Sequence, residues 1–280
     1  MNKIAVIGIA GESVFLSVEN FGKTGETITS SDYYCELGGK GFNQAIAAAR
    51  CGVKVSFLGA AYKDDTGRFE KTAEACGVNA RFIPKSQRSP YAVIMTDANG
   101  DNRVCVYRGA ELRVEDVECF KEEIASSDIL LLTNEVPKAV NERAAEIAVA
   151  SGTRVILNPA PARQNSKALL DKVYLFTPNE HETTGLEDYK NVVLTLGDKG
   201  CLIKESGETV PAIKTDAKDT TGAGDTFNGI LAACIALGDD LRSACFMANA
   251  GASIKVSRKY ILNSIPTKEE IIAFMEKENG

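Results

Sequence analysis

The sequence has no long hydrophobic run and no block of positive charge. No apolar run approaches the roughly 18 residues of a membrane-spanning helix. The amino-terminal stretch MNKIAVIGIAGES is too short and too interrupted by glycine for a signal peptide. The formal net charge is −6, with acidic and basic residues mixed along the chain. We therefore expect a cytoplasmic protein that binds neither nucleic acid nor a membrane.

Histidine is nearly absent, and the cysteines form no metal-binding motif. The single histidine, His181, excludes a His-rich metal site and two-histidine chemistry. None of the eight cysteines belongs to a Cys-x-x-Cys pair, and several lie in apolar patterns, namely Cys105, Cys201, Cys234 and Cys245. Reduced core cysteines explain this distribution better than disulfides or a metal site.

Apolar runs of strand length alternate with patterns of helical period. The expected strands are residues 4–7, 53–58, 129–132, 155–157, 173–176 and 192–196. The expected helices are residues 42–50, 69–76, 140–150, 223–237, 241–256 and 268–278, the last opened by a capping box of Thr267 and Glu270. Continuous apolar strands between helices predict a mostly parallel sheet covered on both faces, a three-layer α/β/α fold.

Two stretches alternate apolar and polar residues instead. They are residues 14–37 and 91–108, and the second contains the hairpin signal Asn99-Gly100. We expect antiparallel strands outside the main sheet, which would form a small β-sheet lid over its carboxyl edge. Such lids exclude water from a reaction. The alternative is an ordinary extension of the sheet edge.

A glycine-rich turn precedes the helix expected at 223–237. It reads Thr220-Thr221-Gly222-Ala223-Gly224 and is followed by Asp225. A helix start presents unpaired N–H groups and the positive end of the helix dipole, which together bind anions. Asp225 could accept a proton from a substrate hydroxyl while the helix start holds a phosphoryl group. Alternatively, it only stabilises the helix dipole, by about 0.3–1 kcal/mol.

Two familiar nucleotide-binding motifs are missing. A Walker A loop needs Gly-Lys followed by Ser or Thr at fixed spacing, whereas Lys40 is followed by Gly41 and Lys23 lacks the upstream glycine. The Rossmann fingerprint Gly-x-Gly-x-x-Gly is absent after the first strand, which makes a dehydrogenase improbable.

Five ordered motifs resemble those of the ribokinase-like, or PfkB, carbohydrate kinases. They are GGKGFNQAIAAARCG (38–52), NPAPAR (158–163), TPNEHE (177–182), TLGDKG (195–200) and DTTGAGDTFNG (219–229). The resemblance covers nearly the whole chain. It implies one ribokinase-like domain over residues 1–280 that uses ATP and Mg²⁺ to phosphorylate a hydroxyl of a sugar or sugar-like molecule. Lids of ribokinases often pair in a dimer, so the resemblance also implies a homodimer through the lid.

The resemblance assigns roles on the catalytic and substrate sides of the site. Asp225 is expected to be the general base. The backbone N–H groups of Gly222, Ala223 and Gly224 are expected to form the anion hole. The substrate-binding residues implied are Gly11, Ser13, Gly39, Lys40, Asn43, Glu135 and Asp225. An amide such as that of Asn43 suits a sugar, because it both donates and accepts hydrogen bonds.

The resemblance also implies a nucleotide and metal side. Asn179 is expected to bind the cofactor, and Glu182 to act on Mg²⁺ through water; alternatively, the two form a capping box of a helix over 179–184. The other nucleotide-binding residues implied are Thr195, Gly197, Gly200, Gly224 and, near the adenine, Asn249.

Three departures from the pattern bear on function. Gly11 and Ser13 stand where ribokinases have an Asn and an Asp that grip the sugar, so the substrate is expected to differ from ribose. Only GLEDYKN stands where relatives have a further helix. The residues that match around the potassium site of ribokinases are Asp219, Thr221, Arg258 and Ser264, but Tyr260 replaces a glycine and Lys255 a small residue.

The sequence leaves alternatives open at these departures. The ammonium group of Lys255 either replaces the charge of K⁺ or points to solvent. The smaller residues at the sugar-gripping positions keep a nucleoside or pseudouridine kinase as an alternative. A catalytically weak ligand sensor on a kinase fold is another, although such a sensor could lose Asp225, Asn179 and Glu182 at no functional cost.

Overall fold

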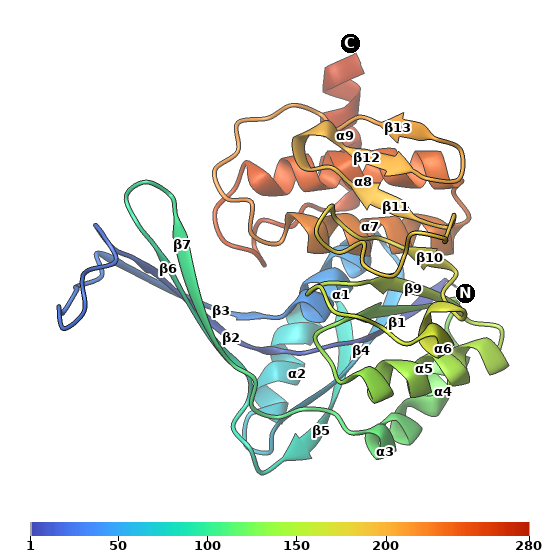
Figure 1. Cartoon of the computed structure of the whole chain (residues 1–280), viewed down its shortest axis with the longest axis horizontal. Helices are drawn as coiled ribbons and strands as arrows, with labels where there is room; N and C mark the ends of the chain where they lie inside the picture. The colour runs from blue at the N-terminus through green and yellow to red at the C-terminus, as the bar shows by residue number, and fades with distance from the viewer. Residues whose placement is uncertain (1, 280) are drawn as a thin grey trace.

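A computed structural model describes residues 2–279 and contains a six-stranded parallel sheet at its centre (Figure 1). Its order is β10-β9-β8-β1-β4-β5. The strands are β1 (Lys3–Ile7), β4 (Lys54–Tyr62), β5 (Val78–Lys85), β8 (Ile129–Thr133), β9 (Arg154–Asn158) and β10 (Leu175–Phe176). Every pairing within it is parallel, which confirms the sheet type predicted from the sequence.

Helices cover both faces of this sheet, so the predicted three-layer α/β/α fold is confirmed. On β1, Ile4 and Val6 join one hydrophobic core, while the alternating residues Ala5 and Ile7 join the other. The first core includes residues of α1 (Lys40–Arg50), α2 (Thr66–Ala75), α7 (Ala223–Leu237), α8 (Leu241–Val256) and α9 (Lys268–Asn279). The second includes residues of α3 (Val114–Val117), η1 (Glu118–Phe120), α4 (Lys121–Ala125), α5 (Lys138–Ala150) and α6 (Lys167–Leu170).

The carboxyl-terminal helices begin where the sequence predicts. Helices α7 and α8 match the expected ranges at both ends, and α9 begins at Lys268. The predicted capping box is present: Thr267 N donates to Glu270 Oε2 at 2.9 Å, and Glu270 N donates to Thr267 Oγ1 at 3.3 Å.

The edges of the main sheet differ from the prediction. Strand β5 was not predicted, because it lies at the sheet edge and buries only some of its residues, so it shows no continuous apolar run. The run expected at 192–196 is a strand of another sheet. It forms β11 (Val193–Thr195), which pairs antiparallel with β12 (Cys201–Ile203), and β12 pairs with β13 (Glu208–Val210). Only isolated bridges connect β11 to the end of the main sheet.

The helix considered for residues 179–184 is absent, and a turn takes its place. Glu182 N donates to Asn179 O at 3.1 Å, and the chain then continues through single turns, closed by Leu186 N to Thr183 O and Tyr189 N to Leu186 O. In the following residues 183–190 only Leu186 is buried, so a helix here would have no apolar face to pack.

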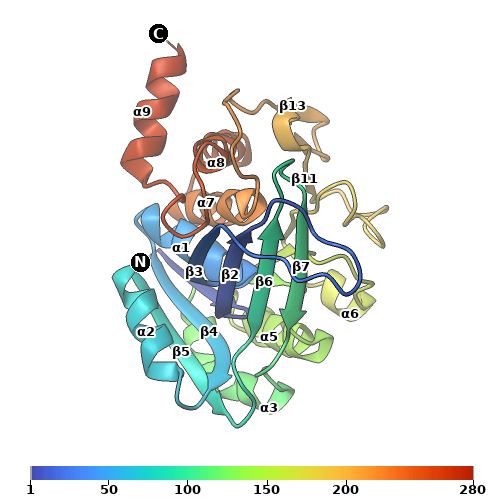
Figure 2. The same cartoon turned by 90° about the vertical axis from the view of Figure 1, so that its left-hand side faces the viewer.

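The two alternating stretches form a separate four-stranded sheet, the lid, with the order β3-β2-β6-β7 (Figure 2). Its strands are β2 (Gly11–Ser17), β3 (Asp32–Gly38), β6 (Tyr91–Thr96) and β7 (Asn102–Tyr107). The outer pairs are antiparallel, as expected, but β2 and β6 pair in parallel. Local alternation predicts each hairpin but carries no information about how two distant hairpins join.

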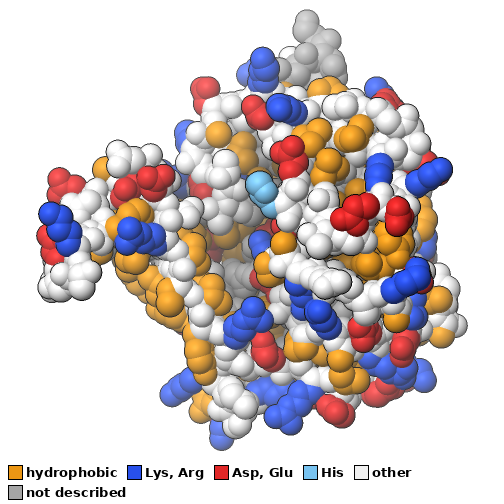
Figure 3. Space-filling view, viewed as in Figure 1, with side chains coloured by type: hydrophobic (Ala, Val, Ile, Leu, Met, Phe, Trp, Pro, Cys, Tyr) orange, Lys and Arg blue, Asp and Glu red, His pale blue; other side chains and the backbone are white. Residues whose placement is uncertain are grey.

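The lid stands away from the body of the molecule and leaves a hollow between them (Figure 3). Cys105 lies on its strand β7 and is exposed, contrary to the prediction that it is a core residue. Cys201, Cys234 and Cys245 are buried as predicted. Within residues 2–279, no helix has the length and apolar character needed to cross a membrane.

Candidate active site

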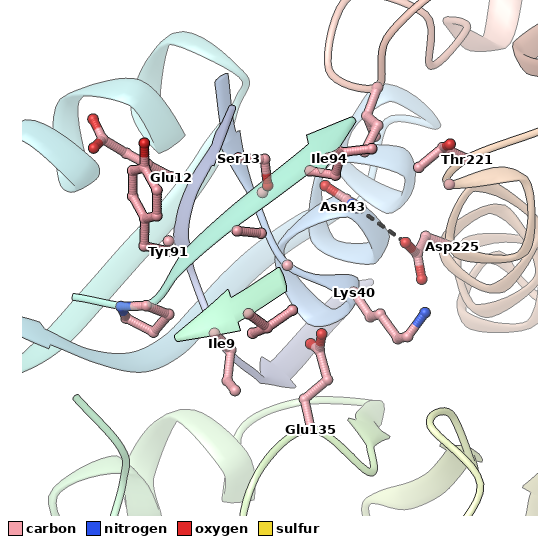
Figure 4. Close-up of a pocket in the computed structure, with 18 of the residues that line it drawn as sticks. Ile9, Glu12, Ser13, Lys40, Asn43, Tyr91, Ile94, Glu135, Thr221 and Asp225 are labelled. Atoms are coloured by element: carbon pink, nitrogen blue, oxygen red, sulfur yellow. Dashed lines mark hydrogen bonds between the residues drawn. The ribbon is translucent and has the colours of Figure 1, made fainter. Parts of the chain in front are cut away.

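A pocket lies between the lid and the starts of helices α1 and α7 (Figure 4). The lid contributes apolar side chains, including Phe15, Tyr91, Ile94 and Val106. The body contributes polar and charged groups. The residues predicted from sequence that line it are Gly11, Ser13, Gly39, Lys40, Asn43, Glu135, Thr221, Gly222 and Asp225. The pocket thus brings together the predicted substrate side and the predicted base.

Asp225 is buried in the first turn of α7, and α1 holds its carboxylate from the opposite side. Asn43 Nδ2 donates to Asp225 Oδ2 at 3.0 Å, as the dashed line in Figure 4 shows. Gln44 Nε2 donates to Asp225 Oδ1 at 3.2 Å. Because each carboxylate oxygen accepts an amide hydrogen, the orientation of the carboxylate is fixed.

Gln44 is a site residue that sequence reasoning missed. Its side chain is fully buried, and Nε2 also donates to Asn158 Oδ1 at 3.1 Å. The available signal was its position: Asn43-Gln44 is a polar pair inside the otherwise apolar helical run of α1. A buried amide in such a run needs a hydrogen-bond partner, and here that partner is Asp225.

A chain of buried polar groups fixes the start of α7 against the sheet. Asn158, at the end of β9, donates through Nδ2 to Thr177 O at 2.9 Å. Thr177 Oγ1 donates to Asn228 Oδ1, and Asn228 Nδ2 donates to Gly224 O at 2.8 Å. The first turn of α7 is therefore tied to the carboxyl ends of β9 and β10, where ligands of parallel sheets bind.

The start of α7 has backbone donors to offer an anion. Gly222 is its N-cap in the left-handed region, with φ 77°, and makes no side-chain cap. Among residues 2–279, the backbone N–H groups of Gly222, Gly224 and Asp225 donate no hydrogen bond. Ala223, predicted to contribute an N–H, instead donates it to Thr220 O at 3.2 Å.

Charged groups surround the base. The Asp225 carboxylate is the main influence that raises the pKa of Lys40, and Glu135 and Glu182 add to it. Burial, followed by the charge of Asp225, raises the pKa of Glu135 to about 7. Gly41 N also donates to Glu135 Oε2 at 3.3 Å. The pocket therefore places Lys40 near the carboxylates of Glu135 and Asp225, beside the helix start (Figure 4).

The residues predicted for the nucleotide lie outside this pocket. Asn179 N donates to Glu182 Oε2 at 3.1 Å, so the pair shares one turn. Thr195, bridged to Asn179, donates through Oγ1 to Pro178 O at 3.3 Å. Gly200 has a packing role as well, because a Cβ there would lie 2.1 Å from Val210 O. Gly197 lies in the same short turn.

Asn249 has a structural role that the sequence did not reveal. Its buried Nδ2 donates to Val210 O at 2.9 Å and to Pro211 O at 3.3 Å. The amide thus connects α8 to the end of β13.

The residues matched to a potassium site also lie together, near the start of α7. Thr221 N donates to Asp219 Oδ1 at 2.9 Å, and Ser264 Oγ donates to Lys259 O. Lys255 is fully buried, with Nζ 2.8 Å from Asp219 O. The alternative that Lys255 points to solvent is therefore wrong.

This architecture, a lidded α/β fold with a carboxylate at an anion-binding helix start, is that of a small-molecule kinase. Comparison with known proteins agrees. Residues 1–188 and 183–268 match the model of the pfkB family of carbohydrate kinases. The chain is 34% identical to a ribokinase of Haemophilus influenzae over 98% of both chains.

Solved structures give the same result. A ribokinase from Thermotoga maritima is 30% identical, with a TM-score of 0.86 over 99% of this chain and 100% of that one. A ribokinase of Arabidopsis thaliana, complexed with ribose and ATP, is 26% identical, with a TM-score of 0.84 over 98% of each. The chain belongs to the pfkB family of carbohydrate kinases. It transfers the γ-phosphoryl group of ATP to a hydroxyl of a sugar or sugar-like small molecule.

Proposed function

We propose that Asp225 is the general base of this kinase and that the start of α7 binds the phosphoryl group as it is transferred. The observation that carries the proposal is the position of Asp225: both carboxylate oxygens are held by α1 amides, beside free N–H groups of α7. Proton removal from the hydroxyl and stabilisation of charge on the phosphoryl group are then adjacent.

Asn43, Lys40 and Glu135 are proposed to bind the acceptor. Asn43 Oδ1 has no hydrogen-bond partner within residues 2–279, which leaves this acceptor for a substrate hydroxyl. Gly11 offers no side chain, and the Ser13 hydroxyl lies against Gly38, where an added Cβ would be 2.6 Å away. The polar contacts of the substrate would therefore come mostly from the body.

ATP is proposed to lie along Asn179, Thr195, Gly197 and Gly200, with Mg²⁺ held on the phosphates. Glu182 has a partly exposed carboxylate near Lys40 and fits a contact to Mg²⁺ through water. Magnesium usually keeps several waters and needs only one or two protein carboxylates beside substrate phosphates. The ion would neutralise charge on the phosphates while Lys40 and the α7 N–H groups position them.

A lid-to-lid homodimer is proposed as the working assembly. Strand β7 is one edge of the lid sheet, and its Val104, Val106 and Tyr107 are exposed. Exposed apolar residues on an unpaired edge favour association with another chain. Analytical ultracentrifugation of the wild type and of Val104→Glu tests this, with a dimer expected only for the former.

A nucleoside is the second candidate acceptor. The lid lines the pocket with the apolar side chains of Phe15, Tyr91, Ile94 and Val106. An apolar, partly aromatic surface suits a planar base as well as the apolar face of a sugar ring.

ADP release from MgATP, measured across pentoses, hexoses, amino sugars and nucleosides, tests the proposal. We expect one strong, selective acceptor, and a sugar is expected to outperform every nucleoside. A nucleoside as the best acceptor would establish the second candidate. Binding of ATP without turnover on any acceptor would contradict the proposal and favour a catalytically weak ligand sensor.

A further inference from the structure

A lysine is buried beside the catalytic helix start. Lys255 lies in the last turn of α8, and its side chain is 0% exposed. Its Nζ donates to Asp219 O at 2.8 Å and lies 3.8 Å from Asp219 Oδ2. Burying an ammonium group is costly unless anionic and carbonyl oxygens surround it, so its retention here needs a reason.

The oxygens that receive this ammonium belong to the segment leading into α7. Besides contacting Lys255, Asp219 accepts from Thr221 N at 2.9 Å and from Tyr260 N at 3.1 Å. Asp219 N and Lys218 N both donate to Val256 O. The conformation of residues 218–222 is thus determined jointly by Lys255 and the end of α8.

The opposite side of the same segment is held by the lid. Glu36, on β3, is buried, and its carboxylate accepts from Ile261 N and Leu262 N, each at 2.9 Å. Ile261 lies against Gly222, where an added Cβ would be 3.0 Å from it. Burial lowers the pKa of Lys255, and the negative charges of Asp219, Glu36 and Asp225 oppose that shift.

The residues that would surround a free monovalent cation already have partners. The carbonyl of Asp219 accepts from Lys255, and the hydroxyl of Ser264 donates to Lys259 O. Tyr260 has a left-handed backbone, φ 64°, and its ring stacks on Tyr34 with the ring centroids 3.8 Å apart. A K⁺ ion would compete with the ammonium for the same oxygens, so the residues present do not fit an added ion.

We propose that the Lys255 ammonium is a covalently attached replacement for a monovalent cation, which holds the anion-binding start of α7 in its working conformation without K⁺. It supplies the same single positive charge to Asp219, at a fixed position and without the entropy cost of binding an ion. Lys255 is a positioning residue: it acts through Asp219 and Gly222 and does not contact the phosphoryl group.

The first test is the cation dependence of the wild type. Turnover, the Kd for MgADP from calorimetry, and the melting temperature are measured in K⁺, Na⁺ and tetramethylammonium salts at equal ionic strength. We expect each Kd and rate to agree within twofold across the three salts. Stimulation of turnover or ADP affinity by K⁺ of fivefold or more over both other cations would overturn the proposal. Calorimetry and melting need no acceptor, so they decide the question independently of the substrate assignment.

The second test removes the charge. Lys255→Met keeps most of the side-chain volume, and Lys255→Ala opens space for an ion. We expect both to lose at least tenfold in turnover and in MgADP affinity. We also expect Lys255→Ala to regain much of the loss, and part of its melting temperature, with K⁺, ammonium or methylammonium. The matched control is Lys259→Met, an exposed lysine just beyond α8, for which we expect no change.

Wild-type ADP affinity and turnover in folded Lys255→Met without K⁺ would overturn the proposal. A folded Lys255→Ala that no monovalent cation improves would also overturn it. If neither variant folds, the salt series on the wild type still decides, because it requires no substitution.

Discussion

Helices α1 and α7 both start at the pocket and are both preceded by an N-cap glycine. The further glycine in the first turn of each helix is present for a different physical reason. Gly39 and Gly222 are the N-caps, both with positive φ and without a side-chain cap. At α1 the backbone is crowded: a Cβ on Gly41 would lie 2.8 Å from Gly8 Cα. At α7 a Cβ on Gly224 would meet nothing within 4 Å.

This difference separates packing from ligand binding. Gly41 is needed because α1 packs closely on the loop after β1. Gly224 has no such neighbour, and a helix start would be slightly more stable with another residue there. The space at Gly224 fits the proposal that a phosphoryl group approaches the backbone there. Substitutions at the two helix starts should separate these roles.

The largest effect is expected at the α7 carboxylate. Asp225→Asn should lower kcat by about 10²–10⁴-fold, because the base is lost while the side chain keeps its size. The melting temperature should change little. Asp216→Asn, an exposed aspartate in the loop before α7, is the control and should keep full activity. Near-normal turnover in Asp225→Asn would remove the base assignment.

The paired glycine substitutions test the comparison directly. Gly224→Ala should fold with unchanged or slightly raised stability but lose at least about tenfold in kcat, because its methyl group occupies the phosphoryl position. Gly41→Ala should instead lose about 1–3 kcal/mol of stability through overpacking. Thermal unfolding and steady-state kinetics of both variants provide the measurement. Equal kinetic effects at equal stability would contradict the distinction.

Substitution of Gln44 on α1 is expected to have a smaller effect on turnover. Gln44→Met removes one of the amide donors to Asp225, so kcat should fall by roughly tenfold, with less change in KM. Steady-state kinetics and thermal unfolding of the variant provide the measurement. A wild-type kcat in the folded variant would show that Gln44 only fills space.

The smallest expected effect is the contribution of Glu135 to the pH dependence of protein stability. Its pKa of about 7 exceeds the ordinary value of 4.5, so between these pH values the folded protein retains a proton that the unfolded chain has lost. Stability should therefore fall as pH rises from 4.5 to 7. Each unit of pKa difference corresponds to about 1.4 kcal/mol. Denaturant unfolding at pH 5 and 7 should show a smaller fall in Glu135→Gln than in the wild type, and equal falls would contradict the assignment.

The sequence by itself determined the layered fold and one half of the site. Strands β1, β4, β8 and β9 are continuous apolar runs because both faces of a parallel sheet are buried. Helices α7 and α8 show their period and their ends in the residues themselves. The motif at 219–229 placed the Asp225 carboxylate in the first turn of a helix from local chemistry alone.

Only the tertiary structure decided which distant groups meet. Gln44 reaches Asp225 across 181 residues, and Lys255 turns toward Asp219 rather than toward solvent. The parallel pairing of β2 with β6 likewise cannot be inferred from the sequence of either hairpin. Periodicity records whether a residue is buried, whereas the identity of its partner depends on how the sheet and helices close around it. Local sequence therefore predicts burial and helix ends, and the completed fold determines the hydrogen-bond partners of each buried polar group.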